Sequence, residues 1–189
     1  GAATKAMMTD GPVWTNKTTI EARCDTGLAE AEAQRTTLKS GATGDKTLVV
    51  YNDMLIALDG TYGLMTLMAS THPVEDVRNA AEACERRVQA LISEINLDRG
   101  LFDAVSQVDL AQVDDQAKRF VKKVLREFRR SGVDKDEATR TRLKELHAKM
   151  VEVGQTFGRN IRDDVRKIYV DNADALKGLP ADWIKAHAP

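Results

Sequence analysis

The stretch VVYNDMLIALDGTYGLMTLMAS, from Val49 to Ser70, is more apolar than the segment before it and has a helical composition. Large apolar side chains recur at helical spacing from the residue before this stretch onward, at Leu48, Tyr51, Leu55, Leu58, Tyr62, Met65 and Met68. This spacing predicts a helix from about Asp45 to Ser70 that is the most buried of the chain. The Leu and Met side chains could line a ligand groove, but core packing is the favoured interpretation.

Helices are also indicated on both sides of this segment. Pro73 and the acidic residues after it suit the start of a helix, and Gly132 suits a left-handed helix end. The expected helices cover residues 15–39, 73–95, 99–108, 115–131, 134–169 and 180–184. No stretch alternates with period two. The chain is therefore predicted to be all-α, an elongated bundle of long antiparallel helices with a coiled-coil-like pair and no sheet.

The helix expected from Asp134 to about Tyr169 is the longest. Its apolar residues fall on one side, which predicts a core-facing stripe made of Leu143, Leu146, Met150, Val153, Phe157, Ile161, Val165 and Ile168. Gly154 and Gly158 interrupt the pattern and predict either a close helix crossing or a bend.

The chain is expected to have three parts: an N-terminal arm at 1–14, a helical domain at 15–171, and a C-terminal turn and helix at 172–189. We expect the last part to lead to a catalytic region that is absent here. Its apolar residues Leu179, Trp183 and Ile184 should then form an exposed patch, satisfied by self-association.

Composition excludes several classes of protein. The formal net charge of -1 provides no global attraction for nucleic acid or an anionic membrane. No apolar run approaches the roughly 18 residues of a membrane span. Cys24 and Cys84 are expected to be two separate buried thiols rather than a disulfide or a ligand pair. The chain begins at Gly1, which suggests a processed or engineered N-terminus, so the compartment stays open between cytoplasmic and periplasmic or secreted.

Catalytic and metal-binding patterns are missing from the sequence. A zincin site needs two histidines one helical turn apart with a glutamate between them, and His72, His147 and His187 do not have this spacing. There is no GxSxG motif, and neither cysteine has a neighbouring histidine. We therefore expect no catalytic, metal-binding or cofactor-binding residue in this chain.

One segment is strongly basic. Its cations are Lys118, Arg119, Lys122, Lys123, Arg126, Arg129 and Arg130. They could follow phosphate groups or bind an acidic partner, but a solvated face that complements the helix dipole is the favoured interpretation. Aromatic residues for base stacking are sparse, so no nucleic-acid partner is expected.

Several short strings occur in an informative order. They are YNDMLIALDG at 51–60, HPVEDVRNAAE at 72–82, FRRSGV at 128–133, RLKEL at 142–146, TFGRNI at 156–161 and LKGLPADWI at 176–184. Together they resemble the N-terminal helical region of the thimet oligopeptidase family, over about 51–187. Lys135 and Asp136 stand where the family commonly has an apolar residue, and the first 45 residues match poorly.

The resemblance implies a zinc-dependent peptidase acting on short peptides, with its HExxH helix far beyond the GLP motif at 178–180. None of the family's metal, acid–base or oxyanion residues maps onto this sequence. The resemblance implies a scaffold role in which long helices form one wall of a channel that admits only short peptides.

Three hypotheses follow. The first is a non-catalytic N-terminal helical domain of a zinc oligopeptidase, with zinc and substrate bound by the full-length protein and with the missing catalytic domain as its partner. The second is a free-standing helical adaptor that binds partner helices. The third is a phosphate-binding helical module that uses the basic segment.

Overall fold

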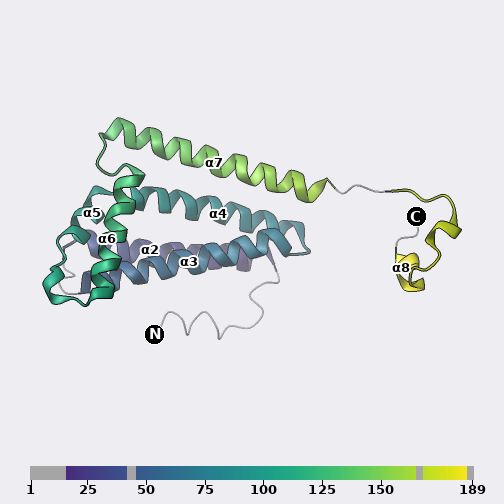
Figure 1. Ribbon diagram of the computed structural model, residues 1–189, viewed down its shortest axis with the longest axis horizontal. Helices are drawn as coiled ribbons and strands as arrows, with labels where there is room; N and C mark the ends of the chain where they lie inside the picture. The colour runs from purple at the N-terminus through teal and green to yellow at the C-terminus, as the bar shows by residue number, and fades with distance from the viewer. Residues whose placement is uncertain (1–15, 42–45, 165–167, 187–189) are drawn as a thin grey trace. The chain divides into compact units, whose positions relative to one another are not determined.

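The computed structural model describes residues 16–41, 46–164 and 168–186 (Figure 1). Within these ranges every regular element is a helix, which confirms the predicted all-α class. Contacts divide the chain into two units, residues 1–155 and 156–189, and each is described on its own. The boundary falls inside the continuous helix α7 (Glu137–Asp163). The expected division into arm, helical domain and C-terminal part stays a prediction, and the arm lies outside the described residues.

Three long helices form the body of the first unit. They are α2 (Lys17–Lys39), α3 (Thr47–Thr71) and α4 (Glu75–Asn96), which pack against one another. Two shorter helices, α5 (Arg99–Ser106) and α6 (Asp115–Ser131), lie at one end of them and are joined through the 3-10 turn η2 (Leu110–Gln112) (Figure 1). The bounds of these five helices agree with the sequence-based expectation to within two residues. None of the described helices has the length and apolarity needed to cross a bilayer.

The core lies between these helices and uses the apolar face of α3 as predicted. Tyr51, Leu58 and Met65 are buried, and Leu55 and Tyr62 pack against the same core. Core packing, rather than a ligand groove, therefore explains the Leu and Met stripe of α3. Phe128 of α6 closes the core at the α5 and α6 end, with ring centroids 6.2 Å from Tyr51 and 6.0 Å from Phe102.

The two cysteines form a disulfide, so the expectation of separate thiols is wrong. Cys24 of α2 and Cys84 of α4 are both buried, and their Cα atoms lie 5.9 Å apart. The sequence spacing of 60 residues carries no information on this pairing, because it depends on the rotation and register with which α2 packs on α4. The helices α2, α3 and α4 all contact one another, and Figure 1 shows them running alongside each other.

Gly132 ends α6 as the sequence predicted. Its φ of 97° is left-handed, and the amide of Val133 donates to the carbonyl of Phe128 at 3.1 Å. A side chain here would also meet Leu143 of α7. This glycine therefore sets the turn that carries the chain from α6 into α7.

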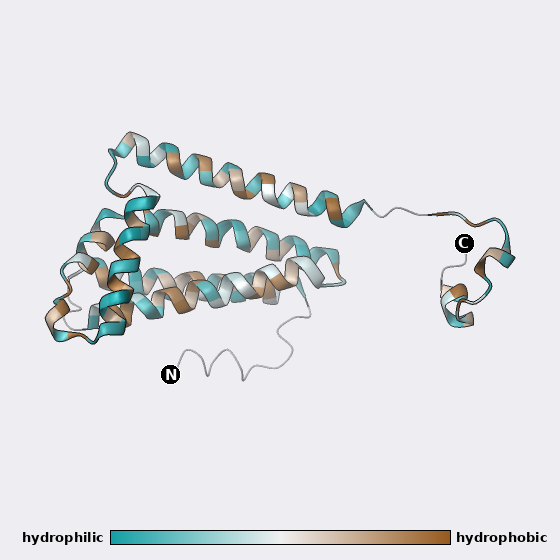
Figure 2. Cartoon of the chain, viewed as in Figure 1, coloured by the Kyte–Doolittle hydropathy of each residue, from teal (hydrophilic) through white to brown (hydrophobic). Residues whose placement is uncertain are grey.

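The apolar stripe of α7 is exposed, so the prediction that it is core is wrong. Met150 is 71% exposed, Val153 67% and Phe157 67%. The residues that α7 turns toward α4 are instead His147 and Gln155, which hydrogen-bond or contact α4. Figure 2 shows hydrophobic residues recurring along α7 among hydrophilic ones. The periodicity correctly identified an apolar face, but the helix presents a different face to its neighbour.

Other details of the α7 expectation also change. The helix ends at Asp163 rather than near Tyr169, Ile168 is exposed, and Val165 lies outside the described residues. A Cβ added at Gly154 or Gly158 would meet no atom within 4 Å. Neither glycine therefore marks a close helix crossing in this chain.

Truncation of Phe157 tests the exposed stripe. We expect Phe157→Ala to change the free energy of unfolding by less than about 0.5 kcal/mol, because surface substitutions rarely do more. Urea denaturation of the wild type and the variant at low protein concentration measures this. A loss of several kcal/mol would mean that the side chain is covered in solution.

The second unit contains the 3-10 turn η3 (Ala173–Leu176) and the short helix α8 (Ala181–Ala186). Leu179 and Trp183 are exposed there, at 43% and 44%, as expected for the apolar patch. Ile184 is half-buried. Self-association through this patch stays a prediction.

Candidate functional site

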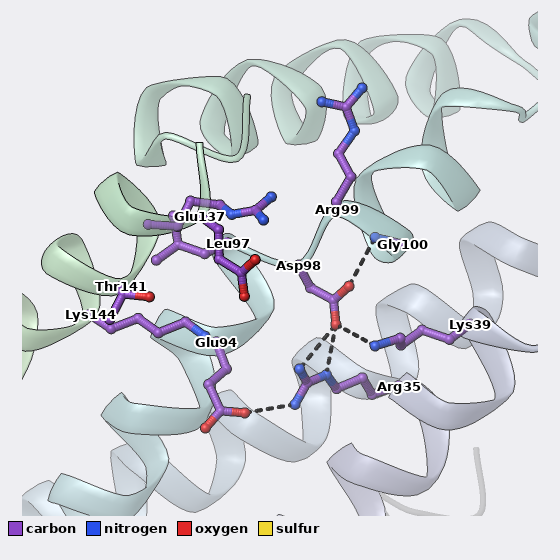
Figure 3. Close-up of a pocket in the computed structure, with 11 residues that line it drawn as sticks. Arg35, Lys39, Glu94, Leu97, Asp98, Arg99, Gly100, Glu137, Thr141 and Lys144 are labelled. Atoms are coloured by element: carbon purple, nitrogen blue, oxygen red, sulfur yellow. Dashed lines mark hydrogen bonds and ion pairs between the residues drawn. The ribbon is translucent and has the colours of Figure 1, made fainter. Parts of the chain in front are cut away.

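A cluster of interacting charges lies where α4 passes into α5, beside the end of α2 (Figure 3). Asp98 starts α5 as its N-cap, and its Oδ1 accepts hydrogen bonds from the amides of Gly100 at 2.9 Å and Leu101 at 3.4 Å. A carboxylate is well suited to this position, because the first amides of a helix have no partner within it.

The second carboxylate oxygen of Asp98 binds two cations from α2. Arg35 donates to it through Nε at 3.2 Å and Nη2 at 3.0 Å, and Lys39 Nζ lies 3.0 Å away. Arg35 also reaches Glu94 of α4 at 3.0 Å and Glu32 at 3.1 Å. The side chains of Arg35 and Asp98 are 15% and 8% exposed. The cluster therefore ties α2 to the junction of α4 and α5 by charge-assisted hydrogen bonds.

These contacts set the ionisation of both partners. Burial alone would raise the pKa of Asp98, but the hydrogen bonds and charges of Lys39 and Arg35 outweigh it and hold the pKa below its usual value. Burial lowers the pKa of Arg35, and its bonds to Glu94 and Asp98 more than reverse this. Both groups are thus charged at neutral pH.

The start of α7 completes the rim of a pocket of about 270 Å³ over this cluster. Asp136 fixes this helix end, because its carboxylate accepts from the amide of Thr139 at 2.8 Å and from its hydroxyl at 2.9 Å. These hydrogen bonds lower the pKa of Asp136. The helix then places Glu137, Arg140 and Lys144 at the pocket.

The charges of the pocket largely satisfy one another. Asp98 and Glu94 are engaged by α2, and Arg99 points away from Asp98 (Figure 3) and pairs with Asp103 at 3.2 Å. Glu137 adds a negative charge among the remaining cations. The arrangement therefore acts as a structural ion-pair network rather than as a set of acid and base groups awaiting a substrate.

A second hollow, of about 370 Å³, lies between α4 and α7. Ser93 Oγ and His147 Nδ1 face each other there at 3.4 Å. That separation exceeds the roughly 2.6–3.2 Å expected of a nucleophile and its base. Glu145, the nearest acidic residue along α7, accepts from Arg142 at 2.7 Å. Within the described ranges, no third group orients the His147 imidazole for catalysis.

The histidines considered in the sequence analysis are not brought together. His72 accepts from the amide of Val74 at 3.1 Å, His147 lies on α7, and His187 is outside the described residues. Among residues 16–41, 46–164 and 168–186, no three His, Cys, Asp or Glu side chains are grouped so as to hold a metal ion.

The basic segment forms α6, and several of its cations have partners. Lys118 pairs with Asp115 at 3.0 Å, Arg130 approaches Glu127 at 3.6 Å, and Arg129 lies over the Phe102 ring at 5.3 Å. These contacts support the interpretation of α6 as a solvated face. Binding of phosphate groups by this helix stays a hypothesis.

Replacement of Asp98 tests the charge cluster. We expect Asp98→Asn to lower the free energy of unfolding by about 2 kcal/mol at pH 7. The substitution removes the negative charge that Arg35 and Lys39 hydrogen-bond, at a side chain that is only 8% exposed. Since the folded pKa is lowered, the carboxylate stabilises the protein above its unfolded pKa of about 3.9, and this contribution disappears as the pH falls through the folded value.

Urea denaturation of both proteins between pH 7 and pH 2 measures the effect. The difference between wild type and Asp98→Asn should shrink below about pH 4. Asp103→Asn is the matched control, because its pair with Arg99 is about half exposed and should contribute little. Equal effects of the two substitutions would contradict the assignment.

The sequence analysis missed this cluster. The expected helices at 73–95 and 99–108 leave Asp98 between them, and an aspartate before a short apolar helix is an N-cap signal. Its partners Arg35 and Lys39 lie 63 and 59 residues away, so no local pattern could have connected them.

Comparison with known proteins gives weak but consistent similarities. No family model matches the chain. It is 26% identical to the mitochondrial intermediate peptidase of Phaeosphaeria nodorum over 169 residues, covering 87% of this chain and 21% of the relative. The corresponding protein of Mycosarcoma maydis is 25% identical over 142 residues, 68% of this chain and 16% of the relative. The Homo sapiens protein is 23% identical over 132 residues, 66% and 18%.

The chain thus spans about a fifth or less of the length of these curated relatives. All of these relatives are named as peptidases, which agrees with the family resemblance noted in the sequence. Their identities of 23–26% support a relationship to peptidases in general terms.

Proposed function

We propose that the chain is a non-catalytic N-terminal helical part of a zinc-dependent oligopeptidase of the thimet oligopeptidase family. The observation that carries the proposal is the similarity to mitochondrial intermediate peptidases, which covers 66–87% of this chain but only 16–21% of the relatives. The ordered strings from YNDMLIALDG to LKGLPADWI agree with this similarity. No group of metal-binding side chains occurs among the described residues, and the proposal places the zinc ligands in the catalytic part of the longer protein.

In this proposal the long helices form one wall of a channel that restricts access to short peptides. Rigidity suits such a wall, and the disulfide between α2 and α4 and the charge cluster at Asp98 both supply it. The partners are the catalytic part of the same polypeptide and the peptides that enter the channel.

Two experiments test the proposal. Sequencing the transcript beyond the codon for Pro189 should find an HExxH helix in the same reading frame, and a stop codon there would refute it. The encoded longer protein should then hydrolyse a short peptide but not a long unfolded polypeptide. Equal cleavage of both substrates would leave the peptidase assignment standing and refute the channel wall.

A free-standing helical adaptor is the second candidate, because the exposed stripe of α7 is a surface that a partner helix could cover. A natural stop codon after Pro189, together with the absence of peptidase activity, would favour it. The sequence of the transcript beyond the codon for Pro189 therefore distinguishes the two candidate functions.

A further inference from the structure

Helix α6 presents a basic face to the solvent. Five exposed cations make up this basic face: Arg119, Lys122, Lys123, Arg126 and Arg130. Since successive residues of an α-helix are rotated by about 100°, these cations fall within an arc of roughly 100°. That arc lies opposite the buried side chains of Val121, Val124 and Phe128. Figure 2 shows hydrophilic residues recurring along this helix. The core therefore fixes α6 with these cations turned outward.

Most of the positive charge of the basic face is not neutralised. Within the described ranges, Arg119, Lys122 and Lys123 form no ion pair with a carboxylate. The other two cations of the face share the single carboxylate of Glu127, at 3.1 and 3.6 Å, and their side chains are 61% and 69% exposed. Exposed pairs of this kind are weak, so they can exchange for the carboxylate of a partner.

The stability of α6 itself does not explain this arrangement. Cations near the C-terminal end of a helix complement its dipole, but Arg119, Lys122 and Lys123 lie in the first half and the middle of α6. Each of them also stands three or four residues from another cation of the face, and like charges at this spacing destabilise a helix. A partner of negative charge would relieve this repulsion.

The spacing of the cations favours an acidic helix as that partner. They occupy four successive turns of α6, which places them about 5.4 Å apart along a line of about 16 Å from Arg119 to Arg130. A second α-helix with one carboxylate per turn repeats at the same interval. Each of its carboxylates can therefore meet one turn of the basic face.

Two other polyanionic partners fit less well. The aromatic residues of α6, Phe120 and Phe128, belong to the core or pack against it, so α6 offers no aromatic ring for base stacking by single-stranded nucleic acid. A helix that lies in a membrane surface turns an apolar face to the lipid, and the apolar face of α6 is used in the core.

The charge of the face indicates a partner that binds reversibly. Permanent burial would desolvate the cations at a cost that pairing seldom repays, whereas a charged surface that stays partly hydrated gives fast, salt-sensitive association. We propose that the basic face of α6 is a docking surface for a helix of a separate protein, with one carboxylate per turn along one side. This inference is independent of the proposed function, because it depends only on the residues of α6.

Binding of a defined acidic helix tests the proposal. The probe is a dye-labelled, alanine-rich peptide with one glutamate per turn along one face, and its isomer has the same glutamates spread around the helix. Fluorescence anisotropy with the 189-residue chain measures both affinities at low salt. We expect the one-faced peptide to bind about tenfold more tightly than its isomer, and its affinity to fall as salt is added.

A variant of the basic face removes its three unpaired cations. It carries Arg119→Gln, Lys122→Gln and Lys123→Gln and should bind the one-faced peptide about tenfold more weakly. Because the substitutions remove like charges from neighbouring turns and glutamine is a good helix former, the urea midpoint should stay equal or rise. A lowered midpoint would instead show that these cations stabilise the fold, and would overturn the proposal.

The matched control removes three exposed cations from other parts of the chain, with the same change in net charge. It carries Lys149→Gln, Lys177→Gln and Lys185→Gln and should leave the affinity for the peptide unchanged. An equal loss of affinity in the two variants would overturn the proposal, because binding would then follow net charge rather than the basic face. Equal affinity of the wild type for the two peptides would overturn it as well.

Other occupants of the basic face give distinct results. Inorganic polyphosphate or phosphatidylserine vesicles that bind through the same three cations, and more tightly than the peptide, would overturn the proposal in favour of a phosphate-bearing partner. Failure of the longer encoded protein to bind the peptide would show that its own chain covers the basic face, and would also overturn the proposal. The HExxH test is unaffected by any of these results, so the two failures are distinguishable.

Discussion

Reduction of the Cys24–Cys84 disulfide should lower the free energy of unfolding by about 4 kcal/mol. The bridge closes a loop across a sequence separation of 60 residues, and the conformational entropy that such a loop removes from the unfolded chain gives this magnitude. Because the two sulfurs are buried between α2 and α4, reduction should leave the native packing recognisable at low denaturant. The loss is a large part of the roughly 5–15 kcal/mol that stabilises an ordinary domain.

Urea denaturation with and without a reductant measures this loss, with mass spectrometry to verify the thiol state. The double variant Cys24→Ala, Cys84→Ala provides the control, since its midpoint should not respond to the reductant. An unchanged midpoint for the wild type after complete reduction would show that the bridge does not stabilise the fold.

Phe128→Ala should destabilise the protein by about 3–5 kcal/mol, the usual cost of removing a buried phenylalanine. Phe128 is 2% exposed and contacts the rings of both Tyr51 and Phe102, so its loss would leave a cavity where α3, α5 and α6 meet.

The same denaturation measurement applies, and Phe157→Ala is the matched control because it removes the same side chain from an exposed position. Equal losses of unfolding free energy in Phe128→Ala and Phe157→Ala would contradict the observed burial of Phe128 and exposure of Phe157. A near-zero effect of Phe128→Ala would do so as well.

Local signals in the sequence predicted most of the helices. The α3 stripe, the cap at Gly132 and the expected helix ranges 73–95 and 99–108 each depend on neighbours within a few residues, and the structure confirms them to within two residues. Pro73 shows the limit of such signals, since the helix begins at Glu75 rather than at the proline.

Features that depend on how helices rotate against one another were not predicted. The pairing of Cys24 with Cys84 and of Arg35 with Asp98 joins residues about 60 positions apart, and α7 turns its polar side to α4. Periodicity identifies an apolar face but not the surface that covers it, so it predicts a core position for the α7 stripe that the structure contradicts.

The attachment of α7 has a dynamic consequence. Residues 137–155 are held on α4 largely by side-chain hydrogen bonds such as those of Gln155, whereas α2, α3 and α4 share a buried apolar core and a covalent bridge. Segments with few buried apolar contacts open locally at a lower free energy than the core around them. Amide hydrogens in this part of α7 should therefore exchange with solvent through detachment of the helix, while those of α3 exchange only when the whole domain unfolds. We therefore expect the seam between α4 and α7 to open locally while the core of α2, α3 and α4 keeps its fold.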